Sequence, residues 1–358
     1  MGKIGLPALL KTMVDQDASD LHITVGCPPE FRIQGKMVKV KTDIMNQQDT
    51  KELCYSVLSD AQKSEFERNL EIDFSFGIKD MARFRGNLFF QRGGVAGVFR
   101  RIPLSIPDFD ALKLPRILKQ VIKRPNGLIL VTGPTGSGKT TTLAAMLDLL
   151  NREEHGHMIT IEDPIEFIHP HKNCIVNQRE VGVDTKSFGS ALKRILRQDP
   201  DFILVGELRD AETVEMALTM AETGHLVFAT LHTNGAVQSI NRIINVFPPY
   251  QQAQIRQVLS FSLQCIVSQM LMPRSSGSGR AMACEILIPT MAIRNLIRED
   301  KIHQIYSSMQ TGQDDSGMQT MNQSLVALVK AGVMNKTDAL ENASMPEELA
   351  KYLAAMPG

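Results

Sequence analysis

The sequence predicts an α/β fold, in which a mostly parallel sheet is wrapped by helices, preceded by an α+β domain and followed by a helical tail. After residue 116, short apolar runs alternate with helical patterns, which is the order typical of a parallel sheet. A glycine-rich loop joins the first of these runs to a helix. Before residue 101, apolar residues instead alternate with the period of half-buried strands.

The composition predicts a globular chain of two domains. The 358 residues are 43% apolar, which is ample for a core in each domain, and 39 basic residues balance 39 acidic ones. This balance argues against a global attraction to nucleic acid. The five cysteines are widely spaced, which predicts a reducing compartment and no zinc site. No run reaches the roughly 18 apolar residues of a membrane span, so we expect a cytoplasmic protein without membrane insertion.

Residues 1–101 are expected to form the first domain. An amphipathic helix opens the chain, strands follow over 21–40 with a turn near Gly35, and residues 47–69 are helical in pattern. Two further strands, within 83–103, are joined by a turn at 92–94. Three prolines then interrupt regular structure, which predicts a semi-rigid linker over 102–116.

Residues 117–289 are expected to form the second domain. Its strands are "GLILVTG", "HMITIED", "DFILVGE" and "HLVFATLH", and its helices begin at Lys139 and cover 186–198 and 211–222. The segment 274–280 has the composition of a flexible linker. From 290 to 358 the pattern is helical, which predicts a helical C-terminal region.

The loop "GPTGSGKTT" has the spacing of the phosphate-binding loop of nucleoside triphosphatases and the strand-to-helix context that such a site needs. Glycines let backbone N–H groups approach phosphates, Lys139 neutralises their charge, and the Thr140 hydroxyl suits Mg²⁺. The alternative is a glycine-rich turn that binds nothing. The predicted nucleotide-binding residues here are Gly133, Pro134, Thr135, Gly136, Ser137, Gly138, Lys139, Thr140 and Thr141.

Acidic residues end two of the predicted strands. Glu207 follows "FILVG", where a carboxylate, more often Asp, helps to hold Mg²⁺; the alternative is that it merely ends a strand. In "TIEDPIEF", Glu162, Asp163 and Glu166 would repel a nucleotide unless one of them acts on water or metal. We assign Glu166 as the general base, against the alternative of an acidic surface turn.

Histidines and arginines supply the remaining candidates. His225 and His232 flank the strand "LVFATL", where either could contact the outermost phosphate, although strand-end histidines are often structural. Arg83, Arg85 and Arg100, with the neighbouring Arg101, lie on predicted strands of the first domain. They could stabilise the transferred phosphoryl group from across a domain interface, or form a solvated basic face.

The assembled segments resemble the type IV pilus retraction ATPases of the secretion-ATPase superfamily, over nearly the whole chain. The resemblance rests on "GPTGSGKTT", "TIEDPIEF", "ILVGELRD" and "TGHLVFATLHTN", in that order. A fifth segment, "AIRNLIREDK" at 292–301, resembles the signature of retraction motors. Relatives that assemble pili or drive type II secretion usually carry a four-cysteine zinc site, which this sequence lacks.

The resemblance implies a PAS-like first domain and a RecA-like second domain, with ATP bound between them in a homohexameric ring. It implies Lys139 and Thr140 as phosphate and Mg²⁺ ligands, Glu207 as the Walker B carboxylate and Glu166 as the catalytic glutamate. His225 and His232 become the His-box pair. It further implies an inner-membrane pilus platform protein as partner, at the base of the pilus machine. A nucleic-acid translocase and a nucleotide-gated scaffold without turnover remain alternatives of other classes.

Overall fold

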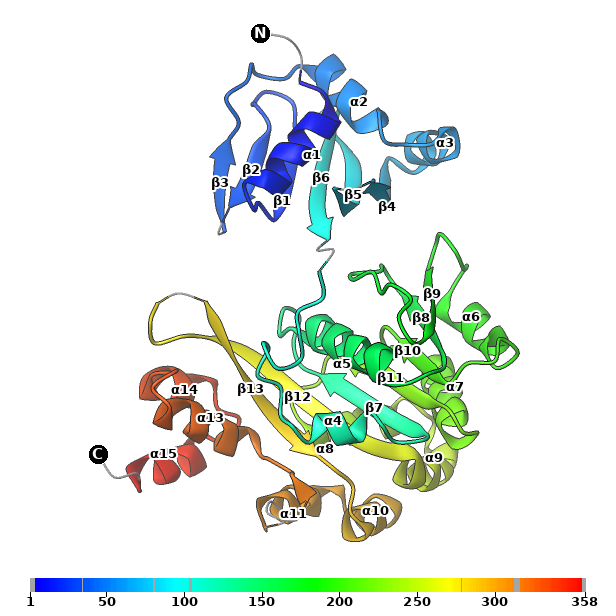
Figure 1. Cartoon of the computed structure of the whole chain (residues 1–358), viewed down its shortest axis with the longest axis vertical. Coiled ribbons are helices and arrows are strands. Elements are labelled where there is room, and N and C mark those ends of the chain that lie inside the picture. The colour runs from blue at the N-terminus through cyan, green and yellow to red at the C-terminus, as the bar shows by residue number, and fades with distance from the viewer. Residues whose placement is uncertain are drawn as a thin grey trace. The chain divides into compact units, whose positions relative to one another are not determined.

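The computed structural model describes residues 4–33, 35–79, 81–102, 105–277, 279–311 and 316–355. The chain divides into two compact units, Met1–Ser105 and Ile106–Gly358 (Figure 1). The first unit is built on an antiparallel sheet and the second on a mostly parallel one. The predicted α/β class with a helical C-terminal region is therefore confirmed.

The first unit is a six-stranded antiparallel sheet in the order β3-β2-β1-β6-β5-β4. Helices α1, α2 and α3 contact strands β1, β6 and β4 and bury an apolar core that includes Leu10, Phe66 and Phe84. Its elements are α1 (Leu6–Asp15), β1 (Asp20–Ile23), β2 (Glu30–Ile33), β3 (Lys36–Lys39), α2 (Gln47–Tyr55), α3 (Asp60–Asn69), β4 (Glu71–Ile78), β5 (Ala82–Gln91) and β6 (Gly94–Ile102). The helices and strands that we predicted here are present, and β4 is an additional strand.

The second unit is a seven-stranded sheet in the order β13-β12-β7-β11-β10-β8-β9. All neighbouring strands are parallel except β12 and β13, which form an antiparallel hairpin. The strands are β7 (Gly127–Thr132), β8 (His157–Glu162), β9 (Ile175–Glu180), β10 (Phe202–Val205), β11 (Leu226–Leu231), β12 (Leu263–Pro273) and β13 (Arg280–Leu287). The segment 274–280, which we predicted as a flexible linker, joins the two strands of this hairpin.

Helices cover both faces of this sheet, as a parallel sheet requires. In β7, Leu128 and Leu130 belong to the core on one face, whereas Ile129 and Val131 belong to the core on the other. The first core includes side chains of α6 (Phe188–Ile195), α7 (Ala211–Glu222), α8 (Ala236–Asn245) and α9 (Pro249–Ser262). The second includes side chains of α4 (Leu118–Val121) and α5 (Lys139–Glu153).

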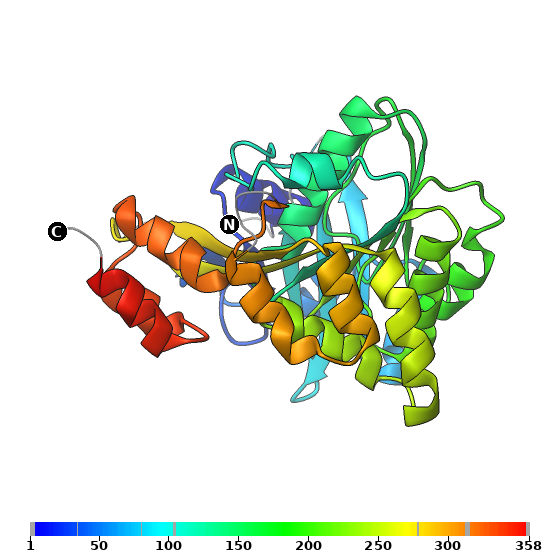
Figure 2. The same ribbon diagram turned by 90° about the horizontal axis from the view of Figure 1, so that it is seen from below.

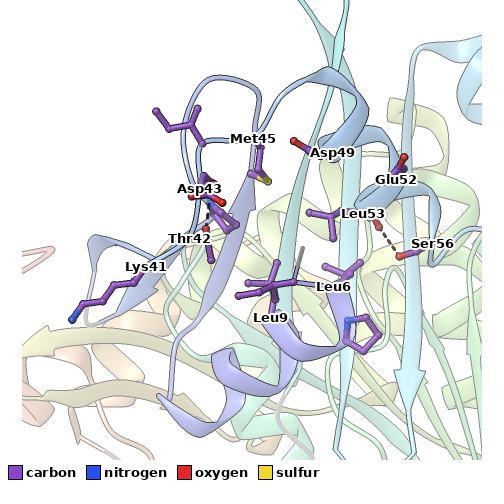
Figure 3. Close-up of a pocket in the computed structure, with 15 residues that line it drawn as sticks. Leu6, Leu9, Lys41, Thr42, Asp43, Met45, Asp49, Glu52, Leu53 and Ser56 are labelled. Carbon is purple, nitrogen blue, oxygen red and sulfur yellow. Dashed lines mark hydrogen bonds between the residues drawn. The ribbon is translucent and has the colours of Figure 1, made fainter. Parts of the chain in front are cut away.

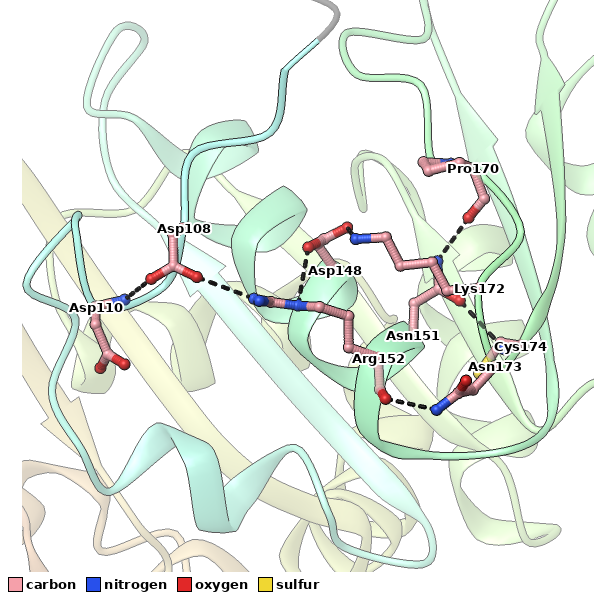
Figure 4. A network of polar contacts seen from close by, with 9 residues as sticks. All are labelled: Asp108, Asp110, Asp148, Asn151, Arg152, Pro170, Lys172, Asn173 and Cys174. Carbon is pink, nitrogen blue, oxygen red and sulfur yellow. Dashed lines mark hydrogen bonds and ion pairs between the residues drawn. The ribbon is translucent and has the colours of Figure 1, made fainter.

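The predicted linker over 102–116 is in large part packed onto the second unit. Phe109 is only 1% exposed, within the core beneath α5. Asp108 forms an ion pair with Arg152 at 3.1 Å (Figure 4). Asp148 forms ion pairs with Arg152 at 3.2 Å and with Lys172 at 2.6 Å. The ion pair between Asp108 and Arg152 holds the segment against α5, and the two compact units divide between Ser105 and Ile106, within the predicted linker.

The C-terminal region is helical, as predicted, and Figure 2 shows its orange and red helices at one end of this unit. Its last helices pack on the β12–β13 hairpin around Met272, Leu325 and Leu349. The elements are α10 (Met291–Arg298), η1 (Ile302–Gln304), α11 (Ile305–Thr311), α13 (Met321–Lys330), α14 (Lys336–Asn342) and α15 (Pro346–Ala354). Within the described ranges, none of the helices combines the length and apolarity needed to cross a bilayer.

Candidate active site

Four parallel strands of the second unit end at the same edge of the sheet, and most of the predicted site residues lie just beyond them. The phosphate loop follows β7, Glu162 ends β8, Glu207 follows β10 and His232 follows β11. Backbone hydrogen bonds continue past the strands: Gly133 N–H donates to the Leu231 carbonyl at 3.3 Å, and Gly206 N–H to the Ile161 carbonyl at 2.8 Å. These hydrogen bonds hold neighbouring chain segments together at the edge of the sheet where the site residues lie.

The phosphate loop needs its glycines. Gly133, Gly136 and Gly138 have φ of 143°, 79° and 88°, a region that other residues rarely adopt. A Cβ atom at Gly133 would also lie 2.3 Å from the Gln269 carbonyl oxygen. The loop leads directly into α5, whose free N–H groups and positive dipole end suit an anion.

The Lys139 side chain packs against the phosphate loop. Its ammonium donates to the carbonyls of Gly133 at 2.8 Å and Pro134 at 3.1 Å, and the residue is only 8% exposed. Burial lowers the pKa of Lys139, while the Glu207 carboxylate acts in the opposite direction. The neighbouring Thr140 is exposed at the start of α5, so its hydroxyl can reach a ligand of the loop.

Glu207 lies between two cationic or potentially cationic groups. Its carboxylate accepts a hydrogen bond from the Arg209 guanidinium at 2.9 Å and lies 3.4 Å from His232 Nε2. Its negative charge raises the pKa of Lys139, against the larger lowering effect of burial. The carboxylate of Glu207 and the hydroxyl of Thr140 are oxygen donors of the kind that Mg²⁺ prefers, so these residues fit the predicted metal.

Glu162 and Glu166 form a carboxylate pair with unequal exposure. Glu162 is 6% exposed, and its carboxylate accepts hydrogen bonds from the Thr160 hydroxyl at 2.6 Å and from the Gln178 amide at 3.1 Å. Burial and, to a smaller extent, the Glu166 charge raise the pKa of Glu162 to about 7, against the lowering effect of these hydrogen bonds. Glu166 is half-buried, so it is the more accessible of the two.

The two histidines lie at opposite edges of the sheet. His232 follows the last residue of β11 beside Glu207, whereas His225 precedes the first, where its Nδ1 lies 3.0 Å from the Met220 carbonyl oxygen. The strand between them spans roughly 17 Å at its ordinary rise per residue. Within one chain, the structure therefore brings only His232 to the phosphate loop.

The three candidate arginines lie on one face of the first unit's sheet. Arg85 and Arg100 are directly opposite each other on β5 and β6, and Arg83 is two residues from Arg85. Each has a local partner: Arg83 donates to the Ser75 hydroxyl at 2.7 Å, Arg85 lies 3.8 Å from Asp73, and Arg100 donates to Asp20 at 2.8 Å. Arg101 points to the other face.

Next to the phosphate loop lies a cavity of about 420 Å³ that sequence reasoning did not predict. Gly138, Thr141 and Thr142 contribute the side nearest the loop. Its remaining walls come from segments distant in sequence, namely 111–114, the β12–β13 hairpin and the C-terminal helices. Lys113, Arg274 and Arg280 are the cations of the lining. Large apolar side chains make up much of the rest: Leu112, Leu114, Leu271, Met282, Leu328 and Val333.

A different cavity, of about 400 Å³, lies in the first unit beside α1 and α2 (Figure 3). Leu6, Leu9 and Leu53 form an apolar surface there. The charged lining is mainly acidic, with Asp43, Asp49 and Glu52 against Lys41. Because acidic side chains repel phosphate, this cavity does not suit a nucleotide.

The segment "AIRNLIREDK" forms α10 with its apolar side inward, as its spacing predicts: Ile293 and Ile297 are fully buried. Arg294 donates to the carbonyls of Ser260 and Phe261 at the end of α9, and Arg298 lies over the Phe261 ring. Since α9 leads into the start of β12, this contact is at the sheet edge opposite the phosphate loop.

Known proteins are similar to this chain over nearly its whole length. Residues 4–341 match the family model described as "Type II/IV secretion system protein". The chain is 50% identical over 339 residues to the type IV pilus retractation ATPase PilT of Pseudomonas aeruginosa, covering 95% of this chain and 98% of that one. It is 47% identical to a twitching motility protein of Neisseria gonorrhoeae, covering 96% and 91%.

Among solved structures, the pilus retraction motor PilT with bound ADP superposes with a TM-score of 0.92 at 51% identity. That match covers 97% of this chain and 99% of the other. Fold and sequence thus agree over at least 95% of the chain. The chain belongs to the type II/IV secretion system protein family, and its similar proteins over nearly the whole chain are named as a pilus retraction ATPase and as a twitching motility protein.

Proposed function

We propose that this chain is a Mg²⁺-dependent ATPase that powers type IV pilus retraction and hence twitching motility. The observation that carries the proposal is the convergence of the phosphate loop, Glu207, His232 and the Glu162–Glu166 pair at one edge of the parallel sheet. Full-length similarity to retraction ATPases supports the direction of the motor.

In this proposal the backbone of 133–138 and the Lys139 ammonium bind the phosphates of ATP. The nucleoside part lies in the adjoining cavity beside Thr141, whose apolar walls suit a base. Glu166 is the general base that takes the proton of the attacking water, because it is the accessible carboxylate of its pair. His232 reports the loss of the outermost phosphate through its contact with Glu207.

Thr140 and Glu207 would hold the Mg²⁺ ion. When bound, the ion supplies neutralisation of the phosphate charge. Because Arg209 lies 2.9 Å from Glu207, this arginine competes with a cation for the same carboxylate and would shift when the metal binds.

Arg83, Arg85 and Arg100 are proposed to stabilise charge on the transferred phosphoryl group from outside the unit that carries the phosphate loop. In this proposal, rigid-body movement between the two units accompanies hydrolysis, and this movement would be converted into pilin extraction. We propose a homohexameric cytoplasmic ring that acts through an inner-membrane platform protein at the pilus base. His225 remains a candidate for contacts made in such a ring.

The test is to replace the chromosomal copy with Lys139→Ala and to measure pilus length and surface motility. Excess non-retracting pili and lost twitching are expected, because assembly would continue without extraction. Lys119→Ala, which removes a surface ion pair with Asp110, is the matched control and should retain motility. Bald cells would contradict retraction and indicate a motor of pilus assembly.

A further inference from the structure

Gln269 of β12 is packed directly against the phosphate loop. It is 1% exposed, and it comes directly after Ser268, which pairs with Thr132 at the end of β7. Its carbonyl oxygen is the atom that a Cβ at Gly133 would strike, and its side-chain nitrogen would lie 3.2 Å from a Cβ at Gly138. The loop is thus shaped around this residue.

The orientation of the Gln269 amide is fixed by one hydrogen bond. Nε2 donates to the Ser137 carbonyl at 2.7 Å, and because a carbonyl can only accept, the nitrogen must be the end that faces it. Oε1 is buried and has no hydrogen-bond partner among the described residues. The Ser137 hydroxyl is likewise buried without a partner there, so it does not supply the missing donor.

A buried acceptor without a donor is unfavourable and uncommon in a folded protein. Gln269 lines the 420 Å³ cavity together with Gly138, the last glycine of the phosphate loop, and with Thr141 and Thr142 in the first turn of α5. A nucleotide whose phosphates occupy the loop would place its nucleoside part in this cavity. Nucleosides carry hydrogen-bond donors, namely the ribose hydroxyls and the exocyclic amine of adenine.

We propose that Gln269 determines nucleotide specificity, in that its Oε1 accepts a hydrogen bond from the nucleoside part of ATP while its Nε2 holds the Ser137 carbonyl. One amide then joins the nucleoside to the backbone of the phosphate loop. This inference rests on the proposed function, since it requires ATP in this site.

The test compares nucleotide binding by the full-length protein and by Gln269→Met, using calorimetry. Four ligands are used: ATP, its 2′-deoxy and 3′-deoxy analogues, and purine riboside triphosphate, which lacks the exocyclic amine. The wild-type protein should bind one analogue about 3- to 10-fold more weakly than ATP, because one hydrogen bond is lost. Gln269→Met should bind that analogue and ATP equally, and the identity of the analogue names the donor.

Two further variants make the result decisive. Gln269→Glu keeps an acceptor oxygen and should retain the discrimination, even where its overall affinity falls. Gln252→Met is the matched control, because it removes an amide-to-carbonyl bond to Phe247 away from the cavity, and it should behave as wild type. Equal discrimination by wild type and Gln269→Met would overturn the proposal, whereas failure of the wild type to bind ATP would overturn the proposed function itself.

Discussion

The two sheets of this protein use charged side chains in opposite ways. In the first unit, arginines lie on the face of an antiparallel sheet, and each is matched by a neighbour, as Arg100 is by Asp20. In the second unit, Lys139, Glu162 and Glu207 lie at one edge of a parallel sheet, where burial and mutual charge shift the pKa of Lys139 and Glu162. The parallel strands end at the same edge of the sheet, so the side chains that follow them lie close together. In the antiparallel sheet, neighbouring strands end at opposite edges, and the charged side chains lie along its face.

In the first unit, the buried carboxylate of Asp20 positions one of the arginines. Asp20 is 3% exposed; burial alone would raise its pKa, but hydrogen bonds from Ser19 and Arg100 lower it overall. The carboxylate is thus kept ionised and positions the Arg100 guanidinium. In the first unit, the altered pKa therefore belongs to the carboxylate that positions an arginine. Four predictions, ordered from the largest expected effect to the smallest, test the difference between the two units.

The largest effect is expected for Lys139→Ala. The phosphate loop loses the cation that neutralises its ligand, so kcat/KM for ATP should fall on the order of 10³-fold in a phosphate-release assay. Lys123→Ala, which removes a surface ion pair with Glu153, should leave the rate unchanged. Retained turnover in Lys139→Ala would mean that the edge of the parallel sheet is not the active site.

The second prediction concerns the buried carboxylate Glu162. Its pKa of about 7 in the folded protein, against an ordinary value of 4.5, means that the folded state binds this proton more tightly than the unfolded state. The free energy of unfolding should therefore fall as pH rises from about 4.5 to about 7, by about 3 kcal/mol, and level off above that.

Glu162→Gln replaces the titrating carboxyl group by an amide that does not ionise. Only the wild type then loses stability as Glu162 ionises, so the difference in unfolding free energy between the variant and the wild type should grow over the same pH range. Urea denaturation at a series of pH values measures it. Glu212→Gln, which changes an exposed carboxylate paired with Lys193, serves as the control. Parallel pH profiles for wild type and Glu162→Gln would show that burial does not perturb this site.

The third prediction separates catalysis from binding at the same edge. Glu166→Gln should lower kcat for ATP on the order of 10²-fold while ATP affinity is preserved, because the amide cannot accept the proton of the attacking water. Single-turnover hydrolysis and equilibrium binding measure the two quantities. Loss of binding in parallel with turnover would assign Glu166 a structural role instead.

The smallest effect is expected in the first unit. Arg100→Ala should reduce ATP turnover by at least about 10-fold, less than a dedicated arginine finger provides, since Arg83 and Arg85 share its face. Arg101→Ala is a close control, because Arg101 lies one residue away on the other face and pairs with Asp17 at 2.7 Å. Equal rates for Arg100→Ala and wild type would leave these arginines as a solvated basic face.

Much of the fold could be predicted because its signals are local. The strands and helices around the phosphate loop have clear periods, and helix α7 begins and ends where the sequence indicates. Strand β4 was missed although "EIDFSFGI" alternates with a strand period, so its signal was available. Strand β12 follows α9 without a break, and its long apolar run does not by itself distinguish a strand from a buried helix.

The sequence by itself determined the phosphate loop, because its function depends on backbone freedom and on the spacing within a single turn. It also determined that Glu207 and His232 lie just beyond the ends of strands. Only the tertiary structure decided that these two side chains meet, that His225 lies at the far edge, and that Gln269 lies beneath the loop, 132 residues from Ser137. The physical reason is that the order of strands in a sheet is set by long-range packing, which no local pattern encodes.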